Sequence, residues 1–175
     1  MGKKLSTNEF RSEIIRLTEQ DPAQAARLLA QRTLNDPPFH EYPWLAKELA
    51  QCVSRPVTYR LGILSTFTLE PIRDIFQATA LAKGFDIKLY FGGFQQLEQE
   101  IIVPGSGLNR HEPQGIVLAW SLQDISPILW QCVLDLTEND IKFEIENVIN
   151  RISAIIQASK TNFPDAQLLV HTFTP

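Results

Sequence analysis

The sequence predicts an α/β sandwich, in which helices cover both faces of a parallel sheet, preceded by a small helical appendage. Short apolar segments bounded by Gly, Pro or polar residues indicate four buried strands, at residues 57–64, 86–91, 115–120 and 166–173. Helical patterns separate these segments, and strands that alternate with helices pair in parallel through crossover connections. We assign residues 1–55 to the appendage and residues 56–175 to the α/β domain.

Three helices are expected in the appendage. The first starts near Ser6, the second starts at Asp21-Pro22, and the third covers residues 42–53. In the α/β domain, the last helix is predicted over residues 138–160, with a capping box at its start. Its apolar period predicts the residues that pack on the sheet: Ile141, Ile145, Val148, Ile149, Ile152 and Ile156.

The composition excludes several classes of function. The net charge is −4 and no basic stripe is present, which argues against binding of nucleic acid. The apolar runs are shorter than a membrane span, and the polar N-terminus has no apolar signal region, so we predict a cytoplasmic protein. Neither a metal-ligand spacing nor a cofactor motif is found, and we predict neither group.

The candidate site is the turn that follows the first predicted strand, Ser65-Thr66-Phe67-Thr68. In open parallel sheets, ligands and catalytic groups gather at the carboxyl ends of the strands. Ser65 is the candidate nucleophile there, and His171, at the same end of the last strand, is its candidate base. Further candidate binding residues follow strands or lie in glycine loops: Thr66, Thr68, Gly92, Gly105, Ser121 and Asp124. Thr68 has an alternative interpretation as the cap of the following helix.

Several segments together resemble the amino-terminal domain of FkbH-like proteins. They occur in the same order as in that family: Leu61-Gly62-Ile63-Leu64-Ser65-Thr66-Phe67-Thr68, Tyr90-Phe91-Gly92-Gly93-Phe94-Gln95-Gln96-Leu97, Pro104-Gly105-Ser106-Gly107-Leu108 and Pro113-Gln114-Gly115-Ile116-Val117-Leu118-Ala119. The resemblance implies that a catalytic HAD-type domain follows, in a protein that loads a glyceryl unit from bisphosphoglycerate onto an acyl carrier protein in polyketide biosynthesis. It therefore implies that the partner is the acyl carrier protein or the downstream HAD-type domain.

The same segments look like an SGNH-hydrolase sandwich, with the flavodoxin-like strand order in which the first strand lies between the second and the third. The catalytic pattern is incomplete, however, because the sequence has no Asp-x-x-His pair and no Gly-x-Asn-Asp segment after the third strand. The HAD nucleophile motif is also absent. The sequence therefore predicts a non-catalytic accessory or docking domain. Because the sequence stops directly after the last predicted strand, we expect the domain to be truncated at its C-terminus. The alternative is a divergent SGNH-type esterase or acyltransferase that uses Ser65.

Overall fold

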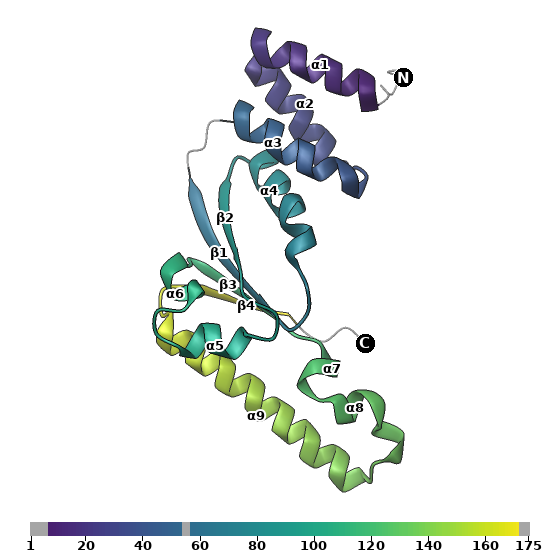
Figure 1. The fold of residues 1–175 in the computed structure, drawn as a ribbon, viewed down its shortest axis with the longest axis vertical. Helices are drawn as coiled ribbons and strands as arrows, with labels where there is room; N and C mark the ends of the chain where they lie inside the picture. The colour runs from purple at the N-terminus through teal and green to yellow at the C-terminus, as the bar shows by residue number, and fades with distance from the viewer. Residues whose placement is uncertain (1–6, 54–56, 172–175) are drawn as a thin grey trace. The chain divides into compact units, whose positions relative to one another are not determined.

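A computed structural model describes residues 7–53 and 57–171 (Figure 1). The chain divides into two compact units, each formed by two separate segments of the sequence. The first unit contains the chain up to Tyr59 together with Pro71–Ile87, and the second contains Arg60–Glu70 and the chain from Lys88 onward. The boundary predicted after residue 55 lies outside the described residues, so the predicted domain organisation stays a prediction.

The first unit is built around four helices: α1 (Thr7–Gln20), α2 (Pro22–Leu34), α3 (Tyr42–Cys52) and α4 (Arg73–Ala82), with a short 3-10 helix, η1 (Phe39–Glu41), before α3. The predicted start of α2 is confirmed, because the Asp21 side chain accepts a hydrogen bond from the Gln24 backbone N–H at 3.0 Å. Apolar faces of all four helices form one core: Ile14, Leu29, Tyr42, Leu45, Ala46, Leu49, Ala78 and Leu81. Burial of this shared core stabilises the unit.

A buried ion pair ties α2 to η1 within this unit. The Glu41 side chain is only 2% exposed and receives two hydrogen bonds from Arg32, at 2.7 and 2.9 Å. Thr7 donates a third hydrogen bond to the same carboxylate at 3.2 Å. The hydrogen bonds from Arg32 are the main reason that the pKa of Glu41 lies below its ordinary value.

The second unit is organised by a four-stranded parallel sheet flanked by helices, and the predicted α/β class is confirmed. Its strands are β1 (Thr58–Ser65), β2 (Asp86–Phe91), β3 (Gly115–Ala119) and β4 (Gln167–Val170), although the first residues of β1 and β2 fall in the first unit. The spatial order is β2-β1-β3-β4, so the predicted position of the first strand between the second and third is also confirmed. Residues 172 and 173, which were predicted to extend the last strand, lie outside the described residues.

Helices α5 (Leu97–Ile102), α6 (Gly107–His111) and α9 (Glu138–Asn162) pack against one face of this sheet. Leu64 pairs with Leu118 in the register of β1 and β3, and Ile116 lies two residues earlier, so the period of two places all three side chains on that face. The core there is completed by residues from the helices and connections: Leu97, Ile101, Leu108, Trp120, Ile125, Val148 and Ile155. Gly62 permits close packing of α6, because a Cβ at that position would overlap the Leu108 side chain.

The helix after β1 begins later than the interpretation of Thr68 as its cap requires. A 3-10 turn, η2 (Glu70–Ile72), intervenes, and α4 starts at Arg73. Pro71 explains the delay, since the residue before a proline is disfavoured in the α-helical conformation. The alternative interpretation of Thr68 as a helix cap is therefore wrong: the N-cap of α4 is Ile72, which makes no side-chain capping bond.

The predicted packing face of the last helix is only partly correct. The capping box is confirmed, with reciprocal hydrogen bonds between Thr137 and Asp140. Val148 is buried, and Ile152 and Ile156 pack against the core, but Ile145 is 44% exposed and Ile149 is 56% exposed. These two residues are exposed because α9 is longer than the strands on which it packs. The 25 residues of α9 extend about 37 Å, whereas five-residue β3 extends about 17 Å.

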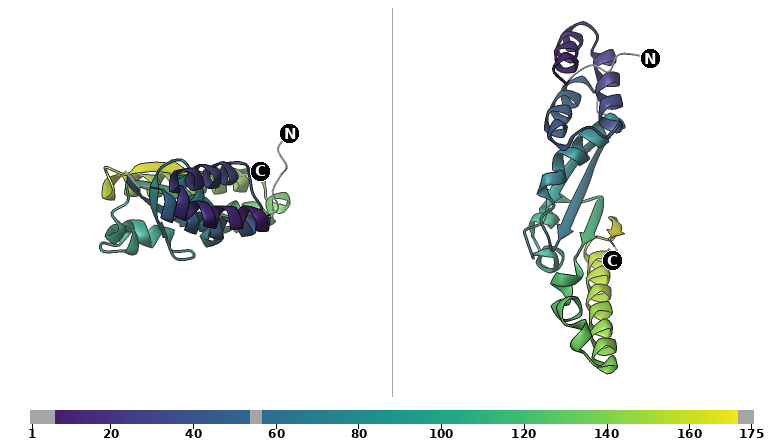
Figure 2. Two further views of the ribbon diagram at one scale, coloured as in Figure 1. Left: turned by 90° about the horizontal axis from the view of Figure 1, so that it is seen from above. Right: turned by 90° about the vertical axis from the view of Figure 1, so that its right-hand side faces the viewer.

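The N-terminal part of α9 therefore runs beyond the sheet. There it lies alongside α7 (Leu122–Ile125) and α8 (Pro127–Gln131), as Figures 1 and 2 show. This part of the second unit also contains a 3-10 turn, η3 (Val133–Asp135). Its apolar side chains remain on the surface, among them Trp130, Leu134 and Phe143 at 56%, 96% and 66% exposure.

Candidate functional site

A cleft of about 300 Å³ lies at the carboxyl ends of β1 and β3 in the second unit. The strand order reverses between these two strands, because the chain continues from β1 to β2 on one side and returns to β3 on the other. Such a switch point is where open α/β sheets bind their ligands. The cleft is lined by residues from the connections after β1, β2 and β3 and from α5, α7 and α9: Thr66, Gln95, Leu97, Glu98, Gln99, Trp120, Asp124, Ile125, Arg151 and Ile155.

Ser65 is the last residue of β1 and is only 7% exposed. Its hydroxyl donates a short hydrogen bond to the backbone carbonyl of Phe67, two residues further along the chain. A serine has one hydroxyl proton to donate, so this bond closes the turn and directs the proton away from a general base. The residues that line the cleft include Thr66 but not Ser65.

His171 follows β4, and its backbone N–H donates to the Leu118 carbonyl at 2.8 Å. Strand β3 lies between β4 and β1, so two strand spacings, about 10 Å, separate the backbones that carry His171 and Ser65. A general base must approach its nucleophile to about 3 Å. In this structure the Ser65 hydroxyl is bonded to Phe67 instead, and the pairing of Ser65 with His171 stays a prediction.

Three of the predicted binding residues are brought together at the cleft. The Thr66 hydroxyl accepts a hydrogen bond from the Ser121 backbone N–H at 3.0 Å, which ties the turn after β1 to the segment after β3. The Ser121 hydroxyl in turn donates to the Asp124 carboxylate at 2.6 Å and caps the start of α7. The sequence therefore identified the correct end of the strands, although the binding role of these residues stays a prediction.

The other predicted binding residues are not among those that line the cleft. Thr68 is exposed in the connection between β1 and η2. Gly92 is buried directly after β2, where a Cβ would come within 2.6 Å of the Leu64 side chain. Gly105 has a φ of +74° in the connection between α5 and α6, a conformation that glycine adopts without strain. The two glycines thus have local structural reasons to be glycine.

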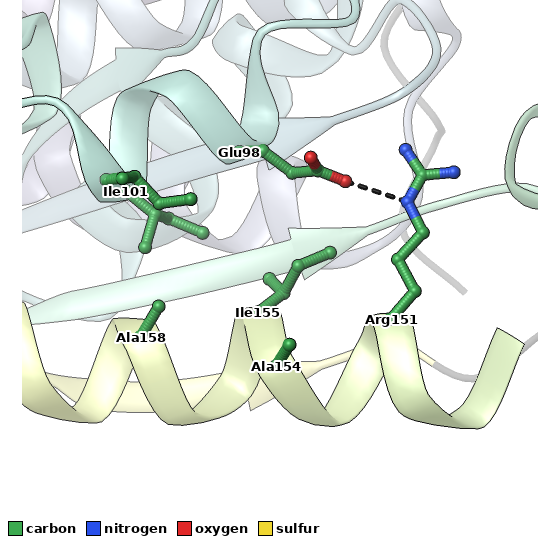
Figure 3. A pocket seen from close by; sticks show the side chains of 7 residues that line it. Glu98, Ile101, Arg151, Ala154, Ile155 and Ala158 are labelled. Carbon is green, nitrogen blue, oxygen red and sulfur yellow. Dashed lines mark hydrogen bonds and ion pairs between the residues drawn. The ribbon is translucent and has the colours of Figure 1, made fainter. Parts of the chain in front are cut away.

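The polar part of the cleft contains residues that the sequence did not single out. Gln95 and Gln99 present exposed amides, and Glu98 forms an ion pair with Arg151 at 2.8 Å, with both side chains about half exposed (Figure 3). Arg151 also donates a long hydrogen bond to the Ile125 carbonyl at 3.4 Å. Trp120, which is 2% exposed, forms an aromatic wall. The arrangement suits a polar ligand held by hydrogen bonds, because its charged side chains already have partners.

A second polar cluster supports the segment that carries the cleft. Glu100 is 8% exposed and accepts hydrogen bonds from the Tyr90 hydroxyl and the Leu108 backbone N–H, both at 2.8 Å. The Ser106 hydroxyl donates to the Glu100 carbonyl at 2.7 Å. Tyr90 also lies against the His111 ring, and burial lowers the pKa of His111. These bonds connect β2, α5 and α6, so we interpret the cluster as structural.

The Tyr90 hydroxyl is expected to make the folded chain sensitive to alkaline pH. Burial, helped by the hydrogen bond to Glu100, raises the pKa of Tyr90 from 10.0 to about 12. A raised pKa stabilises the fold fully below pH 10, and this contribution is lost as the pH rises towards 12. In urea unfolding measured across this range, Tyr90→Phe should remove part of the alkaline loss. At neutral pH it should cost about 1 kcal/mol, because the buried Glu100 loses a partner. An unchanged alkaline loss in Tyr90→Phe would contradict the assignment.

Metal binding and membrane insertion find no support in the part of the chain that the structure describes. Among residues 7–53 and 57–171, no group of three or more His, Cys, Asp or Glu side chains is placed to hold a metal ion. Within the same residues, no helix combines the length and the apolar character that crossing a membrane requires.

Comparison with known proteins yields a similarity of fold. No protein-family profile matches the sequence, and no curated protein matches it. Among solved structures, the chain is similar to the N-terminal part of the protein BF1531 from Bacteroides fragilis, which contains a phosphatase domain and was crystallised as a complex with Mg. The TM-score is 0.61 at 12% sequence identity, and the match covers 78% of this chain. It covers 33% of the BF1531 chain, so this chain corresponds to about a third of that structure.

Proposed function

We propose that this chain is a non-catalytic docking domain of an FkbH-like protein. Its role would be to hold a HAD-type catalytic domain that loads a glyceryl unit from bisphosphoglycerate onto an acyl carrier protein in polyketide biosynthesis. Two findings support the proposal beyond the resemblance of the sequence. The fold is similar to the N-terminal part of a protein that contains a phosphatase domain. The Ser65 hydroxyl is bonded to the backbone rather than to a base.

The observation that carries the proposal is a set of exposed apolar side chains on α9 and β4 of the second unit, which we call the open flank. It consists of Ile145 and Ile149 on α9 and Leu169 and Val170 on β4, with exposures of 44%, 56%, 54% and 41%. Strand β4 is at the edge of the sheet and carries no charged residue. Proteins usually protect such edges with charges, prolines or a covering element. An edge strand without charged residues, together with exposed isoleucines on α9, is typical of a surface that another protein element covers.

The position of these isoleucines on α9 supports a common surface with β4. Ala154 belongs to the side of α9 that faces α5, and Ile149 lies about 140° from it around the helix. Because α5 and α9 pack on the same face of the sheet, the side of α9 away from α5 is the side of the sheet's β4 edge. Val170 lies on the α9 face of the sheet, in register with Leu118, and Leu169 lies on the opposite face. A partner that covers the open flank therefore wraps around the β4 edge and reaches along α9 beyond the sheet.

The apolar character of the open flank favours a permanently attached domain over a carrier protein. Interfaces that stay assembled are more hydrophobic than those that form and dissociate. A HAD-type domain on the same polypeptide remains in place through many turnovers, whereas a carrier protein must leave after each one. We therefore assign the open flank to the HAD-type domain.

The proposal is tested by binding between this chain and a separately expressed HAD-type domain of an FkbH-like protein. Ile149→Glu places a charge in the open flank, and we expect it to weaken binding in isothermal titration calorimetry by at least about tenfold. Ile15→Glu is the matched control, because Ile15 is also a helical isoleucine, 60% exposed, in the first unit. Equal effects of the two substitutions, or the absence of binding by the unsubstituted chain, would contradict the proposed function.

A further inference from the structure

An apolar hollow of about 160 Å³ lies between α5 and α9, next to the cleft (Figure 3). Its floor and walls are formed by Ile101, Ile102 and Ile155 together with Ala154 and Ala158. The two alanines are four residues apart and so lie on the same side of α9. Because each contributes only a methyl group, the space opposite α5 stays unfilled. The hollow can accept a small apolar group without displacing a side chain.

The hollow and the cleft adjoin each other. Three residues, Glu98, Arg151 and Ile155, line both, and the ion pair between Glu98 and Arg151 stands at their junction (Figure 3). On one side of this pair the lining is isoleucine and alanine, and on the other it includes the hydroxyl of Thr66 and the amides of Gln95 and Gln99. The combined surface therefore changes from apolar to hydrogen-bonding over a short distance, at the switch point of the sheet.

The charges around the cleft select the head group of a ligand. An anionic head would face the carboxylates of Glu98 and Asp124. A cationic head would compete with Arg151 for Glu98, and Asp124 is already bonded to the Ser121 hydroxyl. An uncharged head that donates and accepts hydrogen bonds leaves both interactions intact, and the two glutamine amides supply donors and acceptors for it.

We propose that the hollow and the cleft together bind an uncharged amphiphile, with its apolar chain between α5 and α9 and a hydroxyl or amide head in the cleft. The size of the hollow sets the chain length. An engineered protein cavity of about 150 Å³ takes up benzene, so the hollow matches a chain of about six carbons. This site is separate from the open flank, and the inference does not depend on the docking role.

The head-group preference is tested with three ligands that share a six-carbon chain: hexanamide, hexanoate and hexylamine. Binding to the full chain is measured by isothermal titration calorimetry at neutral pH. Intrinsic tryptophan fluorescence, to which Trp120 in the cleft contributes, is a second readout. We expect hexanamide to bind at least about tenfold more tightly than either charged ligand. The absence of hexanamide binding, or equal or tighter binding of hexanoate or hexylamine, would overturn the proposal.

The position of the chain is tested by filling the hollow. Ala158→Phe should weaken hexanamide binding at least about tenfold, and Ala154→Leu is a second, smaller filling substitution at a more exposed position. Ser153→Phe is the control, because Ser153 is exposed on α9 about 140° away from Ala158. Circular dichroism establishes that each variant folds. Hexanamide affinity that is unchanged in whichever filling variant folds, or reduced equally in Ser153→Phe, would place the ligand elsewhere and overturn the inference.

Discussion

Replacing Glu41 with alanine is expected to destabilise the first unit by about 3 kcal/mol, because it leaves Arg32 beside η1 without its partner. The Glu41 carboxylate is 2% exposed and receives three hydrogen bonds, two of them from Arg32. Loss of one member of a buried ion pair leaves the other charge desolvated. The Arg32 side chain is 25% exposed, so water can reach it in part, which places the expected cost at the low end of the range for buried pairs.

The matched control is Glu13, which forms the same two-bonded pair with Arg16, at 2.7 and 3.1 Å. Those side chains are 36% and 57% exposed, and exposed pairs contribute little because water and salt screen them. Urea unfolding followed by circular dichroism should therefore show a large loss for Glu41→Ala and little change for Glu13→Ala. Equal losses in both variants would show that burial of the Glu41 pair has no special role.

The same pair predicts a dependence on acidic pH. Its hydrogen bonds from Arg32 lower the pKa of Glu41 below 4.5 in the folded state. The unfolded chain therefore binds the proton more readily, so the stabilisation is present above pH 4.5 and is lost as the pH falls through the lowered pKa. Glu41→Gln, which keeps the shape of the side chain, should lose less stability on acidification than the unsubstituted chain.

The sequence predicted the sheet well because strand signals are local. Apolar segments with breakers at both ends gave all four strands, and the flavodoxin-like order gave the place of the first strand between the second and the third. Pairing across long sequence separations left no such signal. Glu98 and Arg151 are 53 residues apart, and no local sequence pattern indicates that these two side chains pair. Side-chain direction was equally hidden: the Ser65 hydroxyl bonds to Phe67, which depends on the geometry of the turn.

The error in α9 has a different cause. Helical periodicity identifies the apolar side of a helix, but it does not say how far the opposing sheet extends. Ile145 and Ile149 belong to the same stripe as the residues that pack on the core, yet they lie on the part of α9 where the short strands offer little cover. The apolar stripe of α9 is thus longer than the sheet on which it packs, and its exposed isoleucines form part of the open flank.

Two isoleucines of α9 should respond very differently to substitution with alanine. Ile155 is 7% exposed and belongs to the core with Leu118 and Ile101, so Ile155→Ala is expected to cost about 2–5 kcal/mol through lost burial and a new cavity. Ile149 is 56% exposed, and Ile149→Ala should change the free energy of unfolding by less than about 0.5 kcal/mol. The sequence alone assigned Ile149 to the packing face, where the same cost of about 2–5 kcal/mol would apply.

The two variants control each other, since the residue type, the substitution and the helix are the same. Alanine also has a higher helix propensity than isoleucine, which offsets part of any loss at the exposed position. Urea unfolding of both variants measures the difference directly. A loss above about 2 kcal/mol for Ile149→Ala would mean that its side chain is buried in solution. Self-association through the open flank would explain such burial, and the loss would then shrink on dilution, because binding stabilises a fold in proportion to partner concentration.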